Sequence, residues 1–113
     1  MDCLFCRMVG REAPADVVYE DRDTLVIRDI NPQAPTHLLA IPKKHYSTVH
    51  EVPPSEAGFF DDLFGAVSAV VKQEKIIDYG YRLVVNSGRR TGQSVFHIHV
   101  HILSGRPMHW PPG

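Results

Sequence analysis

The chain has 113 residues with a formal net charge of −1, and 43% of its residues are hydrophobic and 22% charged. This length predicts one domain, and the composition is that of an ordinary globular protein. A net charge close to zero argues against a broad nucleic-acid or membrane surface, because both partners bind clustered positive charge. No apolar run approaches the length of about 20 residues that a membrane span needs, and the N-terminus lacks the apolar region of a signal peptide. We therefore expect a cytoplasmic protein with no nucleic-acid or membrane partner.

A short helix and a β-hairpin are the first elements in chain order. Apolar residues recur on one helical face within residues 2–10, and Pro14 limits that helix. The runs DVVYED (16–21) and TLVIRDI (24–30) are rich in β-branched residues and are separated by a polar turn, which predicts two paired strands. The run THLLAIP (36–42) predicts a third strand.

One long helix and two further strands are predicted in the second half. Within residues 55–75 apolar residues repeat every three or four positions, and Ser55 stands where an N-cap is expected. Residues 81–88 and 94–103 predict the fourth and fifth strands, joined by the turn-rich sequence GRRTG. The proline-rich end of the chain excludes regular structure there. The layout predicts an α+β fold with helices packed on an antiparallel sheet.

The run SVFHIHVHILSG (94–105) contains three of the seven histidines at alternate positions. On a strand, His97, His99 and His101 share one face, and the apolar residues between them face the core. The pattern allows three interpretations: a polar outer face, a three-histidine metal site, or a nucleophile beside a second histidine that binds or orients the substrate. Three ligands on one straight strand do not easily converge on one ion, so we favour the third interpretation.

A histidine nucleophile needs hydrogen-bond donors beside it. Neutral imidazole attacks phosphorus well, and its ordinary pKa of about 6.5 keeps it mostly neutral at about pH 7.5. The attack builds negative charge on the phosphate oxygens, which donors must stabilise. Gly92, Gln93 and Ser94 precede the histidines and supply such groups, and Asn86 is a further candidate. The same residues are also consistent with a plain hairpin turn.

The two cysteines, Cys3 and Cys6, form a C-x-x-C pair. A structural disulfide is not expected in a reducing compartment. The spacing alone leaves open a metal site, a redox pair or two unrelated thiols.

The run HIHVHIL resembles the signature of the histidine triad (HIT) superfamily. The segments 29–45 and 92–113, the opening CLFC and the run VVYED resemble the HINT branch, the histidine triad nucleotide-binding proteins. The resemblance extends over nearly the whole chain. It implies a single HIT domain over residues 1–113, built as a five-stranded antiparallel sheet with one long and one short helix. It also implies a homodimer in which two such sheets join into one.

The resemblance implies an enzyme that hydrolyses purine nucleoside phosphoramidates and related AMP conjugates. His99 would be the nucleophile that forms a covalent nucleotidyl-imidazole, with AMP, GMP or their conjugates as ligands. The other implied catalytic residues are His101, His37 and Ser94. The nucleotide-binding positions are Leu4, Phe5, Met8, Ile27, Asp29, Ile30, Asn86, Gly92, Gln93, Ser94, His99, His101 and Trp110. Among them Asp29 would bind the ribose hydroxyls, the apolar residues would hold the purine, and Trp110 would reach the partner's active site.

A zinc site is also implied, because some HIT proteins carry a C-C-H-H ligand set. The matching positions are Cys3, Cys6, His45 and His97. Two thiolates and two imidazoles suit a structural, tetrahedral Zn²⁺ ion. The alternatives to the phosphoramidase are a protein that binds purine nucleotides and protein partners, and a zinc-dependent hydrolase whose metal is held by the three histidines.

One departure from the family pattern lies in the loop before Gly92. Arg89 and Arg90 stand where we expect no arginine. They are either solvated or bind an acidic leaving group, and the second possibility bears on the natural substrate.

Overall fold

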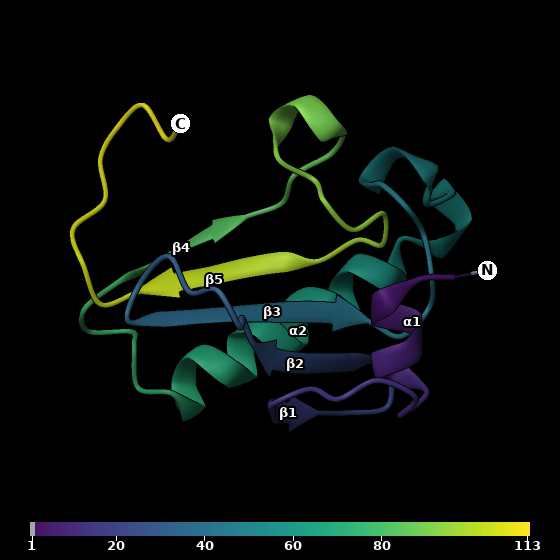
Figure 1. Ribbon diagram of the computed structural model, residues 1–113, viewed down its shortest axis with the longest axis horizontal. Coiled ribbons are helices and arrows are strands. Elements are labelled where there is room, and N and C mark those ends of the chain that lie inside the picture. The colour runs from purple at the N-terminus through teal and green to yellow at the C-terminus, as the bar shows by residue number, and fades with distance from the viewer. Residues whose placement is uncertain (1) are drawn as a thin grey trace.

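The computed structural model describes residues 2–113. In these residues five strands form one sheet in the order β1-β2-β3-β5-β4, and every neighbouring pair is antiparallel (Figure 1). The elements are α1 (Leu4–Val9), β1 (Val17–Glu20), β2 (Thr24–Arg28), β3 (Thr36–Pro42), η1 (Val49–Glu51), η2 (Pro54–Glu56), α2 (Gly58–Gln73), β4 (Tyr81–Val84), η3 (Arg89–Thr91) and β5 (Val100–Ser104), where η marks a 3-10 helix. The predicted α+β fold, with one long and one short α-helix, is confirmed.

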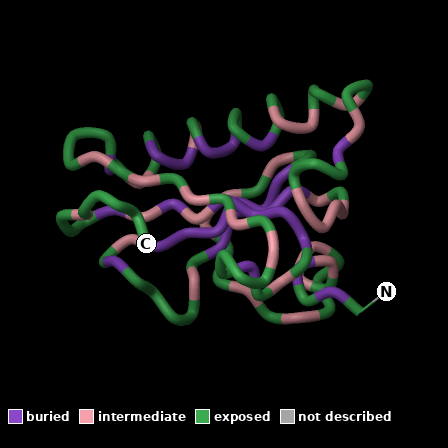
Figure 2. The backbone as a smooth tube through the Cα atoms, turned by 90° about the horizontal axis from the view of Figure 1, so that it is seen from above, coloured by how far each residue is buried: buried purple, intermediate pink, exposed green. Residues whose placement is uncertain are grey.

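The sheet is covered on both faces, by α2 on one side and by α1 with its flanking loops on the other (Figure 2). The central strand β3 shows this in its sequence. Leu38 and Ala40 pack with the apolar face of α2, whereas Leu39 and Ile41 pack with Phe5 of α1. Side chains alternate across a strand, so a strand buried on both faces must be apolar throughout. We call these two sides the α2 face and the α1 face.

Helix α2 begins later than its sequence predicts. Ser55 lies within η2, and the residue before the helix is Ala57, whose side chain makes no capping hydrogen bond, so the predicted Ser55 cap is wrong. The adjacent Pro53 and Pro54 favour a separate turn, which the hydrogen bond from the Glu56 N–H to the Pro53 carbonyl closes before the α-helix starts. The apolar face of α2 is confirmed. Its buried residues are Leu63, Ala66, Val67, Val70 and Val71.

The fifth strand is shorter than predicted, which matters for the histidines. It begins at Val100, so His97 and His99 precede it in an irregular segment. Buried Gln93 holds this segment: its Nε2 donates to the carbonyls of Ser47 and Val95, and its Oε1 accepts the Gly88 N–H. These contacts replace the sheet pairing that the sequence pattern predicts.

The apolar residues between the histidines face the α2 core as predicted: Ile98, Val100 and Ile102 all belong to it. The strand β4 also ends early, at Val84 rather than at position 88. None of the helices in residues 2–113 combines the length and the hydrophobicity that crossing a membrane requires.

Candidate active site and metal cluster

His99 has one ring nitrogen fixed and the other free. Its Nδ1 lies 2.8 Å from the carbonyl oxygen of His97. A carbonyl can only accept, so Nδ1 carries the proton and Nε2 keeps its lone pair. The ring is 6% exposed and stands edge-on to Phe5, with 5.0 Å between ring centroids. Burial lowers the pKa of His99, opposed by the hydrogen bond to His97. The site thus presents a neutral imidazole with a free Nε2.

A chain of hydrogen bonds connects His101 and His37 to the backbone. The Gln33 N–H donates to Nδ1 of His37 at 3.0 Å, so the proton of neutral His37 lies on Nε2. That nitrogen is 2.9 Å from Nδ1 of His101 and 3.4 Å from Oδ2 of Asp29. His101 therefore accepts at Nδ1 and carries its own proton at Nε2. Burial, followed by neighbouring His99 and His37, lowers the pKa of His101 to about 4.

Asp29 has a local structural role as well. Its Oδ1 accepts the N–H of Asn31 at 2.8 Å, which shapes the loop after β2. Burial lowers the pKa of His37, and the charge of Asp29 opposes that shift. A carboxylate oxygen has two lone pairs, so both oxygens of Asp29 retain capacity for another donor.

A cavity of about 230 Å³ opens beside these groups on the α1 face. Its lining brings together most of the residues predicted to bind a nucleotide. These are Leu4, Phe5, Met8, Ile27, Asp29, Ile30, Ser94, His99 and His101. One end is apolar and the other carries the Asp29 carboxylate and the imidazoles, which suits a ligand with an apolar part and a polar part. Ile30 is 98% exposed, so the apolar end is open to solvent.

Four other predicted nucleotide-binding residues do not line this cavity. Gly92 adopts φ of 106°, a left-handed conformation that favours glycine, and Asn86 lies against it. The side chain of Gln93 is committed to the loop contacts given above, and its N–H donates to the Gly88 carbonyl at 3.1 Å. Trp110 is 84% exposed, in a tail tied to β4 by the hydrogen bond from Arg82 to the His109 carbonyl.

The second group of functional candidates is the set of two cysteines and two histidines. Cys3 caps α1, Cys6 lies within it, His45 follows β3 and His97 precedes β5. Their ligand atoms all lie within 4.8 Å of one another. The Sγ–Nδ1 distances are 3.5 Å for Cys3 and His97 and 3.3 Å for Cys6 and His45, and the two Nδ1 atoms are 3.0 Å apart. In tetrahedral zinc sites neighbouring ligand atoms lie about 3.3–3.8 Å apart, given the usual Zn–S and Zn–N lengths.

The orientation of His97 also suits a metal ligand. Its Nε2 donates to the carbonyl of Pro42 at 2.6 Å, which leaves the lone pair of Nδ1 directed into the cluster. Burial lowers the pKa of this ring to about 4. The cluster can therefore hold a metal ion such as zinc. The alternative of two unrelated thiols does not account for the two imidazole nitrogens that lie against them.

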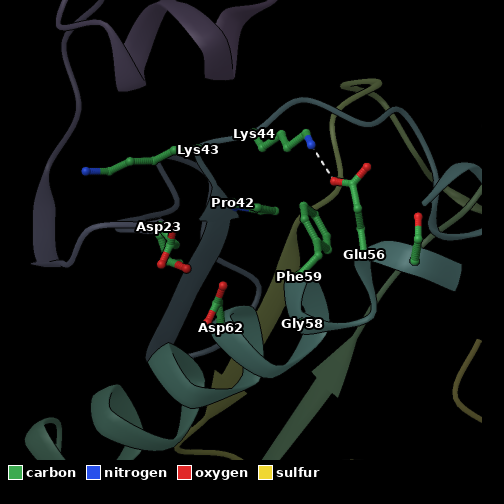
Figure 3. A pocket seen from close by; sticks show the side chains of 10 residues that line it. Asp23, Pro42, Lys43, Lys44, Glu56, Gly58, Phe59 and Asp62 are labelled. Atoms are coloured by element: carbon green, nitrogen blue, oxygen red, sulfur yellow. Dashed lines mark hydrogen bonds and ion pairs between the residues drawn. The ribbon is translucent and has the colours of Figure 1, made fainter. Parts of the chain in front are cut away.

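Another hollow, of about 330 Å³, lies on the α2 face between the β2–β3 end of the sheet and the start of α2 (Figure 3). Its two lysines are already paired, Lys43 with Glu20 at 2.8 Å and Lys44 with Glu56. No histidine or cysteine lines it. It shares no wall residue with the cavity that contains His99 and His101, so it takes no part in the site described above.

Residues 10–108 match the HIT domain. The chain belongs to the HIT domain family. An uncharacterized HIT-like protein of Synechococcus elongatus is 43% identical over 112 residues, which cover 99% of this chain and 97% of that protein. Among solved structures, a HIT family hydrolase from Legionella pneumophila is 46% identical with a TM-score of 0.95, covering 99% of this chain and 100% of that one. A histidine triad nucleotide-binding protein from Candida albicans is 29% identical with a TM-score of 0.83, covering 99% and 85%.

The HIT superfamily is thereby confirmed, whereas the HINT branch stays a prediction. The structure also adds residues that the sequence analysis did not assign to this HIT site. Arg28, Leu39 and Val95 line the cavity beside the predicted residues. Leu39 was identifiable only as an apolar residue of a buried strand, and nothing in its sequence position distinguishes a cavity wall from core.

Proposed function

We propose that this HIT family protein hydrolyses purine nucleoside phosphoramidates and related AMP conjugates through a covalent nucleotidyl-His99 intermediate. The observation that carries the proposal is the free Nε2 of His99, which the bond from Nδ1 to the His97 carbonyl leaves unprotonated beside the cavity. A relative of the same family is called a hydrolase, which agrees with the reaction class.

The proposed reaction has two steps. Nε2 of His99 attacks phosphorus, a P–Nε2 bond forms and the bond from phosphorus to the leaving amine breaks. The departing amine leaves with a proton taken from solvent, while the Nε2–H of His101 donates to a phosphate oxygen. Water then attacks phosphorus, the P–Nε2 bond breaks and the water proton goes to solvent. The net change is one water consumed, with the nucleotide and the free amine released.

The other side chains bind and position in this proposal. The purine lies at the apolar end of the cavity, and Asp29 accepts from the ribose hydroxyls. The Ser94 hydroxyl, with Asn86 and Gly92 nearby in the loop, stabilises charge on the phosphate oxygens. His37 is a positioning residue, because its Nε2–H holds His101 in one tautomer.

We propose a structural role for zinc at Cys3, Cys6, His45 and His97. When bound, the ion would tie α1 to the loops before β5 and after β3. Four protein ligands leave no open position for a water molecule, so the ion would not take part in the chemistry. The competing zinc-dependent hydrolase has less support, since no candidate metal group in residues 2–113 contains all three triad histidines.

We further propose that two copies of the chain pair through the open edge of β4. Tyr81 and Leu83 of this strand are 43% and 37% exposed, and Phe64 of α2 is 43% exposed. An unpaired edge strand beside apolar residues favours addition of another strand. Trp110 would then approach the partner's active site. Light scattering at micromolar concentration should give the mass of a dimer, and a monomeric mass would refute this arrangement.

The function is tested by incubating purified protein with adenosine 5′-phosphoramidate and its guanosine counterpart. We expect release of the nucleoside monophosphate and, in samples quenched during turnover, a nucleotide adduct on His99 by mass spectrometry. If the protein binds AMP but releases no product from either compound, the nucleotide-binding alternative is correct and the hydrolase is refuted.

A further inference from the structure

A second hollow adjoins the nucleotide cavity on the α1 face. It has a volume of about 510 Å³. It shares three wall residues with that cavity, namely Leu4, Ser94 and Val95. The remaining wall residues are Asp2, Cys3, Arg7, His45, Ser47 and Phe96. Ser94 thus stands between two hollows, one that contains His99 and one that the proposed reaction has not used.

The position of Ser94 indicates which part of the substrate occupies this second hollow. If Ser94 binds the scissile phosphate, the nucleoside occupies the cavity on one side of it. The leaving group is attached to the same phosphorus and must extend elsewhere. The second hollow is the neighbouring space that also has Ser94 in its wall.

The charge around this hollow is positive in excess. Arg7 lies in its wall and pairs with Asp2 at 3.5 Å, so these two charges offset each other. Arg89 adds a further cation, since its Cζ lies 5.7 Å from the ring centroid of Phe96, a wall residue. No carboxylate of residues 2–113 lies within 4.0 Å of the Arg89 guanidinium nitrogens. A guanidinium that lies over a ring in this way keeps N–H groups available for an anion.

We propose that the second hollow is the leaving-group subsite and that Arg89 selects leaving groups that carry a carboxylate or a phosphate. This inference rests on the proposed function, because it places the scissile phosphate at Ser94. The natural substrate is then a nucleoside phosphoramidate whose amine bears an acidic group. The chemistry at phosphorus is unchanged, and the acidic group leaves intact with the amine.

The test uses four adenosine 5′-phosphoramidates of similar length that differ in the charge of the leaving amine. The amines are β-alanine, phosphoethanolamine, β-alaninamide and 1,3-diaminopropane. For the wild-type protein we expect the two acidic amines to give a higher kcat/KM than the neutral one, and the cationic amine to give the lowest. The two acidic amines distinguish a carboxylate ligand from a phosphate ligand.

The variant Arg89→Gln should lower the ratio of kcat/KM for acidic over neutral amines by about fivefold, the size of one partly exposed charge contact. Arg22→Gln is the matched control, because it removes the same charge from an exposed position in the β1–β2 turn. It should leave the ratio at the wild-type value.

Several outcomes would overturn the subsite. Equal kcat/KM values for acidic and neutral amines in the wild-type protein would refute it, as would an unchanged ratio in Arg89→Gln. An equal fall in Arg22→Gln would show that overall charge, and not the position of Arg89, sets the preference. If none of the four compounds is hydrolysed, the proposed function itself fails and the subsite falls with it.

Discussion

His97 and His99 are two residues apart, yet the fold presents opposite ring nitrogens of the two side chains. His97 donates from Nε2 to the carbonyl of Pro42, which leaves Nδ1 for the cysteine cluster. His99 donates from Nδ1 to the carbonyl of His97, which leaves Nε2 for the cavity. The difference shows that a main-chain carbonyl can decide which chemistry an imidazole is available for.

The surroundings of the two rings also differ, with candidate metal ligands around His97 and a cavity beside His99. His97 meets two thiols and a second imidazole, a set of soft ligands suited to zinc. His99 meets the ring of Phe5 and the polar end of a cavity. We therefore expect changes at the metal cluster to affect mainly stability, and changes at the cavity to affect mainly turnover.

The largest expected effect is that of His99→Ala. Removal of the attacking nitrogen should lower kcat by at least about 10³-fold, as losing a nucleophile does in other enzymes. AMP binding, measured by calorimetry, should remain because the apolar end of the cavity is intact. His50→Ala, at an exposed histidine in η1, is the control and should keep wild-type turnover. Turnover by His99→Ala near the wild-type rate would show that His99 does not supply the attacking nitrogen.

Cys3→Ser is the complementary change. It removes one of four ligands, so elemental analysis should find a clear fall from about one zinc per chain, as a closed four-ligand site implies. The melting temperature should fall by roughly 5–15 °C, the consequence of losing about 2 kcal/mol in a domain of this size. kcat should change less than about tenfold, since the carbonyl of residue 97 still orients His99.

A chelator distinguishes the metal from the thiol itself. It should lower the melting temperature of the wild-type protein and leave that of Cys3→Ser unchanged. Suppose instead that the wild-type protein is purified without metal, has two freely titratable thiols and is as stable as Cys3→Ser. This result would show that the two cysteines and two histidines bind no metal ion.

The smallest expected effect is a pH dependence of stability that reports on His101. Its pKa is about 4 in the folded chain, against 6.5 ordinarily. The unfolded chain therefore binds the proton more tightly, so the free energy of unfolding falls as pH drops below 6.5 and levels off below about 4. Between pH 7 and pH 5 this side chain should contribute a loss of about 2 kcal/mol.

This contribution is measured by urea unfolding of wild-type protein and His101→Asn at both pH values. The variant should lose less stability than the wild type on acidification, because it lacks the proton-binding site of His101. An identical loss would mean that His101 is solvated in the folded chain.

The sequence predicts the fold better than the details of the site. The unbroken apolar run of β3 fixes a strand buried on both faces, and its predicted bounds agree with the structure. The start of β5 was not predictable, because the segment before it is held by Gln93 through contacts with a loop far away in sequence. The predicted Ser55 cap failed for a local reason, since two adjacent prolines close a separate turn first.

The family resemblance predicted most residues of the site, whereas their orientations depend on the folded structure. The cysteines and histidines of the metal cluster were predicted as a set from the family resemblance, and their ligand atoms converge. The tautomers of His37 and His99 depend on the Gln33 N–H and the His97 carbonyl, whose directions no sequence pattern specifies. The wall shared by the two hollows is likewise a property of packing.

The carbonyl that orients His99 belongs to the backbone of residue 97, and every amino acid has one. The side chain at that position can therefore be exchanged without removing the group that orients His99. A descendant chain that lost both cysteines and His97 would lose the ligands of the proposed zinc ion but would keep the same imidazole orientation. The proposed metal site and the proposed chemistry can therefore be inherited separately, although residue 97 belongs to both.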